Sequence, residues 1–245
     1  MFTHHRTQGI ILEKNDRGEA NQLLTFYTED YGKLEILCRA IRKSQSKLRA
    51  GADFLFFSYI EFIRGKAGKT LTDAILIEKF HKIRKNLGKL TVAKEITETL
   101  DRLTRIEQKD VKIWVFLLKT LKVLNDCQLP EEKLKLLYQY FFWKTIALLG
   151  YKPELYNCAV CQCKLIPGTL YFNPKEGGMA CKNCYQEIEG SKEIPLDVIK
   201  ILRFIIGKDW ATVSRLKISE NDLDLLKETS NFYLSFIVKP AISDS

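Results

Sequence analysis

The chain has 245 residues, of which 46% are hydrophobic and 28% are charged, a composition typical of a folded globular protein. Lys and Arg outnumber Asp and Glu by 39 to 30, and the net charge of +9 is compatible with a nucleic acid or another anionic partner. The first residues, MFTHHRTQG, lack the apolar core of a signal peptide, and no run of about 20 apolar residues predicts a membrane span. We therefore expect a cytoplasmic protein, in which clustered cysteines bind metal or do redox chemistry more often than they form disulfides.

The first 80 residues alternate between apolar and polar side chains and are broken by turn signals. This pattern predicts five strands, at residues 7–15, 21–28, 33–40, 53–65 and 69–80. Five short antiparallel strands suit a small closed barrel, for which the OB-fold is the commonest solution. We therefore expect an OB-fold nucleic-acid-binding domain over residues 1–80.

The pattern becomes helical after residue 80. Apolar spacing predicts helices over residues 90–105, 111–124, 131–150, 193–207 and 219–239, the second and third of them apolar almost all round and therefore central. Pro130, Glu131 and Glu132 favour a helix start, and Gly150 favours a stop. The predicted fold class is α+β: an N-terminal five-stranded OB-fold barrel, then a helical domain over residues 81–245 that an inserted cysteine-rich segment interrupts at 154–188.

That segment reads CAVCQCKLIPGTLYFNPKEGGMACKNC from Cys158 to Cys184 and holds five of the seven cysteines. Cys158 and Cys161 form one CxxC pair, and Cys181 and Cys184 form another after a gap of 19 residues. Two such pairs can converge on one tetrahedral zinc ion. Between them, LYFNPKEGGMAC predicts a hairpin with its turn at Gly177 and Gly178, which is typical of a zinc ribbon. We expect Zn²⁺ bound by Cys158, Cys161, Cys181 and Cys184.

The predicted zinc is structural, because four thiolates leave no open position for a substrate. The three histidines, His4, His5 and His81, all lie far from the cysteines in sequence. Cys163 could replace Cys161 as a ligand, although a spare thiol beside the site is the simpler interpretation. Cys38 and Cys127 lie in apolar runs and are expected in the core.

Other motifs favour ordinary structural roles. GKAGKT at residues 65–70 resembles the end of a P-loop, but Ile63 stands where the first glycine belongs, so a hairpin turn is expected. Glu131 and Glu132 favour a helix start over an acid/base pair, and His4 and His5 favour an exposed terminus over a metal site. We predict no catalytic residues and no enzymatic activity.

The sequence RAIRKSQSKLR, residues 39–49, is the best candidate for binding a polyanion. It has five basic residues and no acidic one, so it could form a flexible arm that follows phosphates, although a solvated surface loop explains the charge equally well. Tyr27, Tyr31 and Tyr59 could offer faces for base stacking. The candidate DNA-binding residues are Lys33, Arg39, Arg42, Lys43, Lys47 and Arg49.

The chain resembles the RecO family of recombination mediators in the order of its motifs. These are the TQGIIL start, the GKLEIL strand that runs into RAIRKSQSKLR, the helical region and the YFNPKEGGMAC segment. The resemblance covers essentially the whole chain. Because this chain keeps all four cysteines, it resembles the zinc-bearing members of the family.

The resemblance implies a protein that binds single- and double-stranded DNA and anneals complementary strands. It also implies that, with RecR, the protein helps RecA replace single-strand-binding protein. The barrel and its basic residues would contact DNA, RecR would compete for that barrel, and the helical domain would hold the C-terminal tail of single-strand-binding protein. The expected location is the bacterial cytoplasm, in association with the nucleoid.

Two other functions remain open from the sequence. A basic barrel and a zinc ribbon would equally serve an RNA-binding or ribosome-associated protein, which a preference for RNA over matched DNA would reveal. A metal-dependent nucleic-acid enzyme would degrade DNA until a chelator is added.

Overall fold

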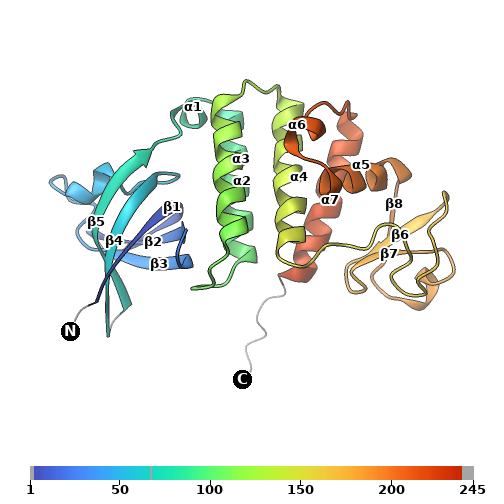
Figure 1. The fold of residues 1–245 in the computed structure, drawn as a ribbon, viewed down its shortest axis with the longest axis horizontal. Helices are drawn as coiled ribbons and strands as arrows, with labels where there is room; N and C mark the ends of the chain where they lie inside the picture. Colours follow the sequence, from blue (N-terminus) through green and yellow to red (C-terminus); the bar gives the residue numbers. More distant parts are fainter. Residues whose placement is uncertain (1–2, 67, 239–245) are drawn as a thin grey trace. The chain divides into compact units, whose positions relative to one another are not determined.

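The computed structural model describes residues 3–66 and 68–238, and it divides into two compact units, Met1–Gln128 and Leu129–Ser245. Figure 1 shows a β-rich part followed by helices and a second, smaller sheet along the chain. Among the described residues, no helix combines the length and the apolar character needed to cross a membrane.

The first unit begins with five strands that close into a barrel in the order β1-β2-β3-β5-β4. These are β1 (Thr3–Arg17), β2 (Asn21–Thr28), β3 (Gly32–Cys38), β4 (Phe57–Gly65) and β5 (Gly68–Glu78). All strand pairs are antiparallel except β3 with β5, which meet as a parallel pair at Leu37 and Thr70. The predicted five strands are therefore confirmed, and GKAGKT lies in the β4–β5 hairpin, although Ala67 falls outside the described residues.

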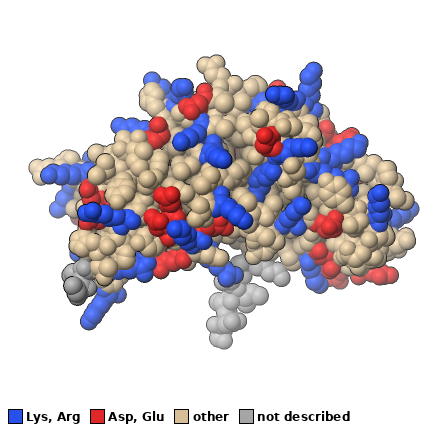
Figure 2. Space-filling view, viewed as in Figure 1, with Lys and Arg blue, Asp and Glu red and all other residues tan. Residues whose placement is uncertain are grey.

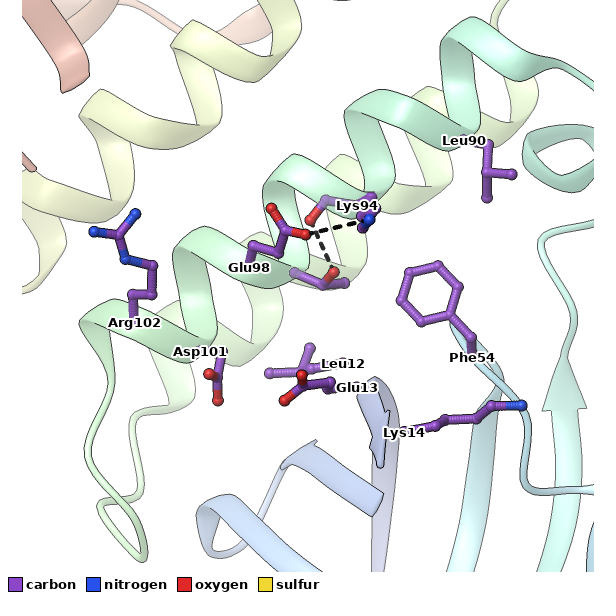
Figure 3. A pocket seen from close by; sticks show the side chains of 10 residues that line it. Leu12, Glu13, Lys14, Phe54, Leu90, Lys94, Glu98, Asp101 and Arg102 are labelled. Atoms are coloured by element: carbon purple, nitrogen blue, oxygen red, sulfur yellow. Dashed lines mark hydrogen bonds and ion pairs between the residues drawn. The ribbon is translucent and has the colours of Figure 1, made fainter. Parts of the chain in front are cut away.

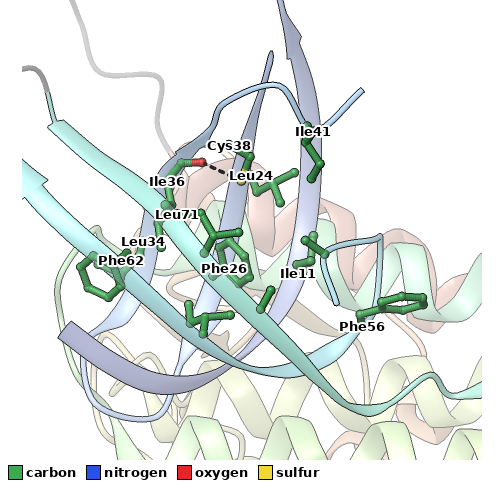
Figure 4. Packing of buried hydrophobic residues seen from close by; sticks show 13 residues of the cluster. Ile11, Leu24, Phe26, Leu34, Ile36, Cys38, Ile41, Phe56, Phe62 and Leu71 are labelled. Carbon is green, nitrogen blue, oxygen red and sulfur yellow. Dashed lines mark hydrogen bonds between the residues drawn. The ribbon is translucent and has the colours of Figure 1, made fainter. Parts of the chain in front are cut away.

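Alternating side chains of these strands fill the barrel (Figure 4). Phe26, Leu34, Ile36 and Phe62 are fully buried there, as the period of two predicts. Cys38 belongs to this cluster, and burial raises the pKa of its thiol to about 12. The expected core position of Cys38 is confirmed.

Three helices complete the first unit: α1 (His81–Arg84), α2 (Leu87–Leu103) and α3 (Val111–Asp126). The end of α2 and the loop between α2 and α3 lie against the barrel. The ammonium group of Lys33 pairs with Asp101 at 3.2 Å, Glu107 pairs with Arg64 at 3.2 Å and with Lys69, and the Glu107 amide donates to the Lys33 carbonyl at 2.8 Å. These contacts explain why the compact unit extends beyond residue 80, where the strand pattern ends.

Gly32 at the start of β3 lies directly against this loop. It has a φ of +66°, and a Cβ atom at this position would lie 1.9 Å from the Gln108 carbonyl oxygen. Glycine is therefore required at this position for two reasons: it accepts the left-handed backbone, and it has no side chain that would collide with the loop.

The second unit consists of α4 (Glu131–Leu148), α5 (Leu196–Gly207), α6 (Trp210–Val213) and α7 (Glu220–Ile237), with a small sheet inserted between α4 and α5. Trp143 of α4 is fully buried and stacks on Tyr233 of α7, with ring centroids 5.6 Å apart. Phe172 from the sheet meets the Tyr233 ring edge-on at 5.2 Å. The sheet therefore shares the aromatic core of the helices.

The inserted sheet has the order β7-β6-β8. Its strands are β6 (Leu170–Asn173), β7 (Gly178–Ala180) and β8 (Lys192–Ile194). The predicted hairpin is confirmed as β6–β7, but its turn lies at residues 174–177 rather than at Gly177 and Gly178, because Gly178 already pairs with Asn173. Gly178 is the first residue of β7, and a Cβ atom there would lie 2.4 Å from the Glu154 carbonyl oxygen. β8 was not expected, and it extends the sheet beyond residue 188.

The expectation that Cys127 lies in the core is wrong. Cys127 is exposed and ends α3. Its carbonyl and that of Asn125 accept hydrogen bonds from the ammonium group of Lys89, at 2.7 and 2.9 Å. Lys89 is buried because its ammonium group binds these free carbonyls at the C-terminal end of α3. The buried apolar face of α3 therefore ends one turn before Cys127.

Candidate functional sites

The structure brings four of the five clustered cysteines together. The sulfur atoms of Cys158, Cys161, Cys181 and Cys184 all lie within 4.8 Å of one another, and the Cys161 and Cys181 sulfurs are 3.9 Å apart. Four sulfurs around a tetrahedral zinc, each about 2.3 Å from the ion, would be about 3.8 Å apart. This cluster could therefore hold a metal ion, and its donor set and spacing suit a soft tetrahedral cation.

Short hydrogen bonds fix the backbone of both pairs. The Gln162 amide donates to the Cys158 carbonyl at 2.9 Å, and the Cys184 amide donates to the Cys181 carbonyl at 3.1 Å. Gln162 adopts a left-handed conformation, with a φ of +61°, that turns the chain after Cys161. The Cys181 amide points at the Cys158 sulfur at 3.4 Å, which joins the two turns.

The pKa values of the Cys158 and Cys184 thiols are shifted in opposite directions. Burial opposes ionisation of Cys158, but the amides of Cys161, Cys181 and Val160 outweigh it and lower its pKa to about 6. The pKa of Cys184 is raised because its thiol shares hydrogen bonds with Cys161 and Cys181. Negative charge on one sulfur therefore disfavours ionisation of the next, a conflict that a bound cation would relieve.

Cys163 lies outside the group of four. It is exposed, and its neighbour Cys161 contributes most to raising the pKa of its thiol, to about 12. Its carbonyl accepts a hydrogen bond from the Cys158 amide at 2.8 Å. The backbone of Cys163 therefore supports the first turn.

Glu154 anchors the segment that leads into the cysteines. Its carboxylate accepts hydrogen bonds from the amides of Asn157 and Tyr156, at 2.9 and 2.7 Å, and these bonds lower its pKa. Its own backbone pairs with β7 beside Gly178. The Arg203 guanidinium on α5 donates to the Leu155 carbonyl at 3.0 Å. Sequence spacing did not reveal the contact of Arg203, because it joins residues that are 48 positions apart in the chain.

The second candidate site is the basic loop, residues 39–51, which leads from β3 across one end of the barrel. It contains successive hydrogen-bonded turns and a short 3-10 helix, η1 (Lys47–Ala50). Ile41 is buried in the barrel core and Leu48 packs against it. The Gly51 carbonyl accepts a hydrogen bond from the Ser58 hydroxyl at 2.6 Å. The loop is therefore anchored at several points and presents its cations in defined positions.

Five of the six predicted DNA-binding residues lie exposed on this loop. Arg42 pairs with Asp16 at 3.1 Å, but both side chains are about half exposed, so the pair can readily exchange partners. Among the described residues, the other four side chains have neither an ion pair nor a hydrogen bond; they are Arg39, Lys43, Lys47 and Arg49.

Lys33, the sixth predicted residue, has a different environment. Its side chain is only 13% exposed, and its ammonium group is held by the carboxylate and the carbonyl of Asp101. Lys33 and Arg39 belong to the same strand-to-loop segment, but the α2–α3 loop covers only the former. The structure thus separates one expected DNA contact from the other five.

A groove of about 590 Å³ lies between β1 and α2 in the first unit (Figure 3). Leu12, Phe54 and Leu90 give it an apolar lining. Two of its cations are already paired, Lys94 with Glu98 at 3.7 Å and Lys14 with Asp53. Glu13, Glu98 and Asp101 also line the groove, whereas residues 39–51 contain no acidic side chain, so the groove is less suited to phosphate than the basic loop.

A barrel with an exposed cationic loop, joined to a helical unit with a four-thiol cluster, defines a protein suited to a polyanion and a metal ion. Comparison with known families agrees. The model described as recombination protein O N terminal matches residues 1–80, and the one described as recombination protein O C terminal matches residues 84–242. The chain therefore belongs to the recombination protein O (RecO) family of DNA repair proteins.

Curated relatives support the same assignment. The DNA repair protein RecO of Dehalococcoides mccartyi is 32% identical over 236 residues, which cover 96% of this chain and 90% of the relative. The DNA repair protein RecO of a Thermoanaerobacter species is 30% identical over 215 residues, covering 87% and 84%. That of Halalkalibacterium halodurans is 26% identical over 229 residues, covering 94% and 88%.

Proposed function

We propose that this protein is a recombination mediator that binds single- and double-stranded DNA and anneals complementary strands without catalysing a chemical step. The observation that carries the proposal is the anchored loop with four unpaired cations on a five-stranded barrel. The barrel's strand order supports its description as an OB-fold, whose domain we place at residues 1–80. Annealing requires only that phosphate repulsion be screened while bases stay free to pair.

The expected partners follow from membership of the family. In this proposal RecR contacts the barrel, and the helical domain at 81–245 holds the tail of single-strand-binding protein. The complex then helps RecA to load onto DNA in the bacterial cytoplasm, close to the nucleoid. Because RecR and DNA would share the barrel, they would compete for it.

We assign a single structural Zn²⁺ to Cys158, Cys161, Cys181 and Cys184, within a ribbon at residues 154–188. All four positions around the ion would be filled by thiolates, so it would staple the inserted sheet rather than activate water. The fit of the sulfur spacing to a tetrahedral ion supports this assignment.

The mediator function predicts faster pairing of two complementary oligonucleotides coated with single-strand-binding protein. The measurement is the annealing rate at two salt concentrations. We expect salt-sensitive acceleration, because phosphate contacts weaken as salt rises. Absence of acceleration on both coated and naked strands would contradict the proposal and favour the alternative, an RNA-binding zinc protein. Acceleration of naked strands alone would argue against the partnership with single-strand-binding protein.

Charge reversal tests the basic loop directly. Exchanging Arg42 and Lys43 for Glu should weaken binding of single-stranded DNA at least tenfold and reduce the slope of log affinity against log salt by about 1.4, if each cation neutralises one phosphate. The control reverses Lys112 and Lys119 on α3, which are exposed and change the net charge equally. An equal loss in both double variants would point to net charge rather than to this loop.

A further inference from the structure

The structure distinguishes the three tyrosines that the sequence offers as stacking platforms. Tyr27 is fully buried, although it lies on the outer face of β2. Tyr31 packs edge-on against Phe62, with centroids 5.7 Å apart, and contributes to the barrel core. Tyr59 alone of the three is exposed, at 40%. Only Tyr59 therefore presents a ring that an incoming base could reach.

Tyr59 lies within a small apolar surface on the outer face of β4 and β5. It pairs with Ile75 across the two strands, and Ile77 follows on the same face of β5. Ile75 is 59% exposed and Ile77 is 48% exposed, which is unusual for isoleucine side chains on a strand. We call these three residues the outer patch.

The basic loop lies beside the strand that carries most of the outer patch. Within the described part of the chain, β3 pairs with β5 only at Thr70, so the later part of β5 has no strand on that side. Gly51 fills the gap so closely that a Cβ atom there would lie 2.0 Å from the Ala74 carbonyl oxygen. Figure 1 shows the loop at this edge of the barrel, and Figure 2 shows Lys and Arg side chains projecting from the same edge. Ala74 is the direct neighbour of Ile75.

The opposite face of the barrel is already occupied within the first unit. OB-type barrels commonly bind oligonucleotides over strands β2 and β3. Here Tyr27 and Lys33 pair across those strands on the outer face. Lys33 is held by Asp101 near the end of α2 and bridges to Ile106 of the α2–α3 loop, while Tyr27 is fully buried and lies close enough to Asp110 to feel its charge. The β4–β5 face is the one that combines an open aromatic ring with nearby unpaired cations.

The charges around the outer patch favour one orientation of a bound polynucleotide. Glu61 follows Tyr59 on the same face, but Arg6 and His4 bond to its carboxylate at 2.7 and 2.8 Å. Asp73 lies across from Glu61 on β5. The guanidinium of Arg6 offsets only one of these two carboxylates, so phosphates would favour the loop over this end of the strands while the bases turn toward the patch.

We infer that the outer patch stacks the unpaired bases of a single-stranded polynucleotide whose phosphates lie on the basic loop. This inference rests on the proposed function and adds to it a preference for single strands. A duplex hides the faces of its bases, so it could use the loop but not the ring of Tyr59.

The test compares Tyr59→Ala with Tyr59→Phe in fluorescence-anisotropy titrations of an oligo(dT) and of a duplex of equal length. The loss of one stacked base should weaken oligo(dT) binding about tenfold in Tyr59→Ala. Tyr59→Phe should bind as the parent does, because it keeps the ring. Duplex affinity and the salt slope should be unchanged, since no cation is removed. Tyr151→Ala removes another exposed tyrosine and serves as the control.

Three outcomes would overturn the inference: unchanged oligo(dT) binding, an equal loss on the duplex, or a change in self-association with DNA binding intact. The last would show that a second copy of the chain covers the patch. The double reversal of Arg42 and Lys43, measured in the same titrations, separates this inference from the proposed function. If the reversal weakens binding while Tyr59→Ala does not, DNA binding at the loop stands and the stacking role fails.

Discussion

Replacing Cys181 with serine is expected to abolish stoichiometric zinc binding and to destabilise the second unit by more than about 3 kcal/mol, because structural zinc contributes its binding energy to folding. The sulfur of Cys181 lies 3.9 Å from that of Cys161, and its amide supports Cys158. A hydroxyl group in its place would leave three thiolates and a poor fourth ligand.

Metal content and unfolding should be measured together on the purified variant. Loss of the ion should free the β6–β7 hairpin and then expose the core, because Phe172 packs against Tyr233 between the helices. Hydrogen exchange should therefore increase first at residues 154–194 and next in α4 and α7. DNA affinity should change much less than stability, since the cations of the basic loop belong to the first unit.

Cys163→Ser is the matched control, because it removes an exposed thiol from the same turn while leaving the group of four intact. It should keep one zinc per chain and the parent's stability. If Cys181→Ser remained stable with one zinc bound, or if Cys163→Ser lost the ion, the assignment of ligands would be wrong.

Gly32→Ala is expected to destabilise the first unit by more than about 3 kcal/mol. The left-handed backbone costs a residue with a side chain about 1–2 kcal/mol, and the new methyl group would collide with the Gln108 carbonyl at 1.9 Å. Relief of that collision would pull the α2–α3 loop from the barrel and weaken the pairs that Asp101 and Glu107 make with it.

Gly18→Ala separates these two contributions. Gly18 has the same φ of +66°, but a Cβ atom there meets no atom of the described residues within 4 Å. The Gly18→Ala variant should therefore lose only the backbone contribution, about 1–2 kcal/mol of unfolding free energy measured in urea. Trp114 is buried in the first unit and reports the transition by its fluorescence. Equal losses in the two variants would show that the contact with the loop contributes nothing to stability.

Several features could be predicted from the sequence because they depend on residues close together in the chain. Alternating apolar residues predicted the barrel strands, since each side chain on one face meets the same core. The two CxxC pairs predicted a four-thiol cluster, because a tight turn brings its two sulfurs together whatever lies around it. Pro130 and the two glutamates predicted the start of α4 at Glu131.

Other features depend on contacts that local patterns do not encode. Lys33 and Arg39 look alike in the sequence, yet Lys33 is held by Asp101, 68 residues away along the chain. Cys127 closes an apolar run, but its carbonyl serves a buried lysine from another helix. In both cases the role of the residue depends on which distant segment packs against it. The intervening chain could place that segment in many ways, so the sequence pattern near the residue does not reveal it.

By itself, the sequence determined the five strands, the principal helices, the cysteine cluster and the family, because each is set by short-range spacing or by the order of motifs. Only the tertiary structure decided which cations remain unpaired, which of three tyrosines stays exposed, and why Gly32 must be glycine. These properties arise where segments distant along the chain meet. Burial and pairing are properties of the assembled surface, so the same residue type can be a structural contact at one position and a binding group at another.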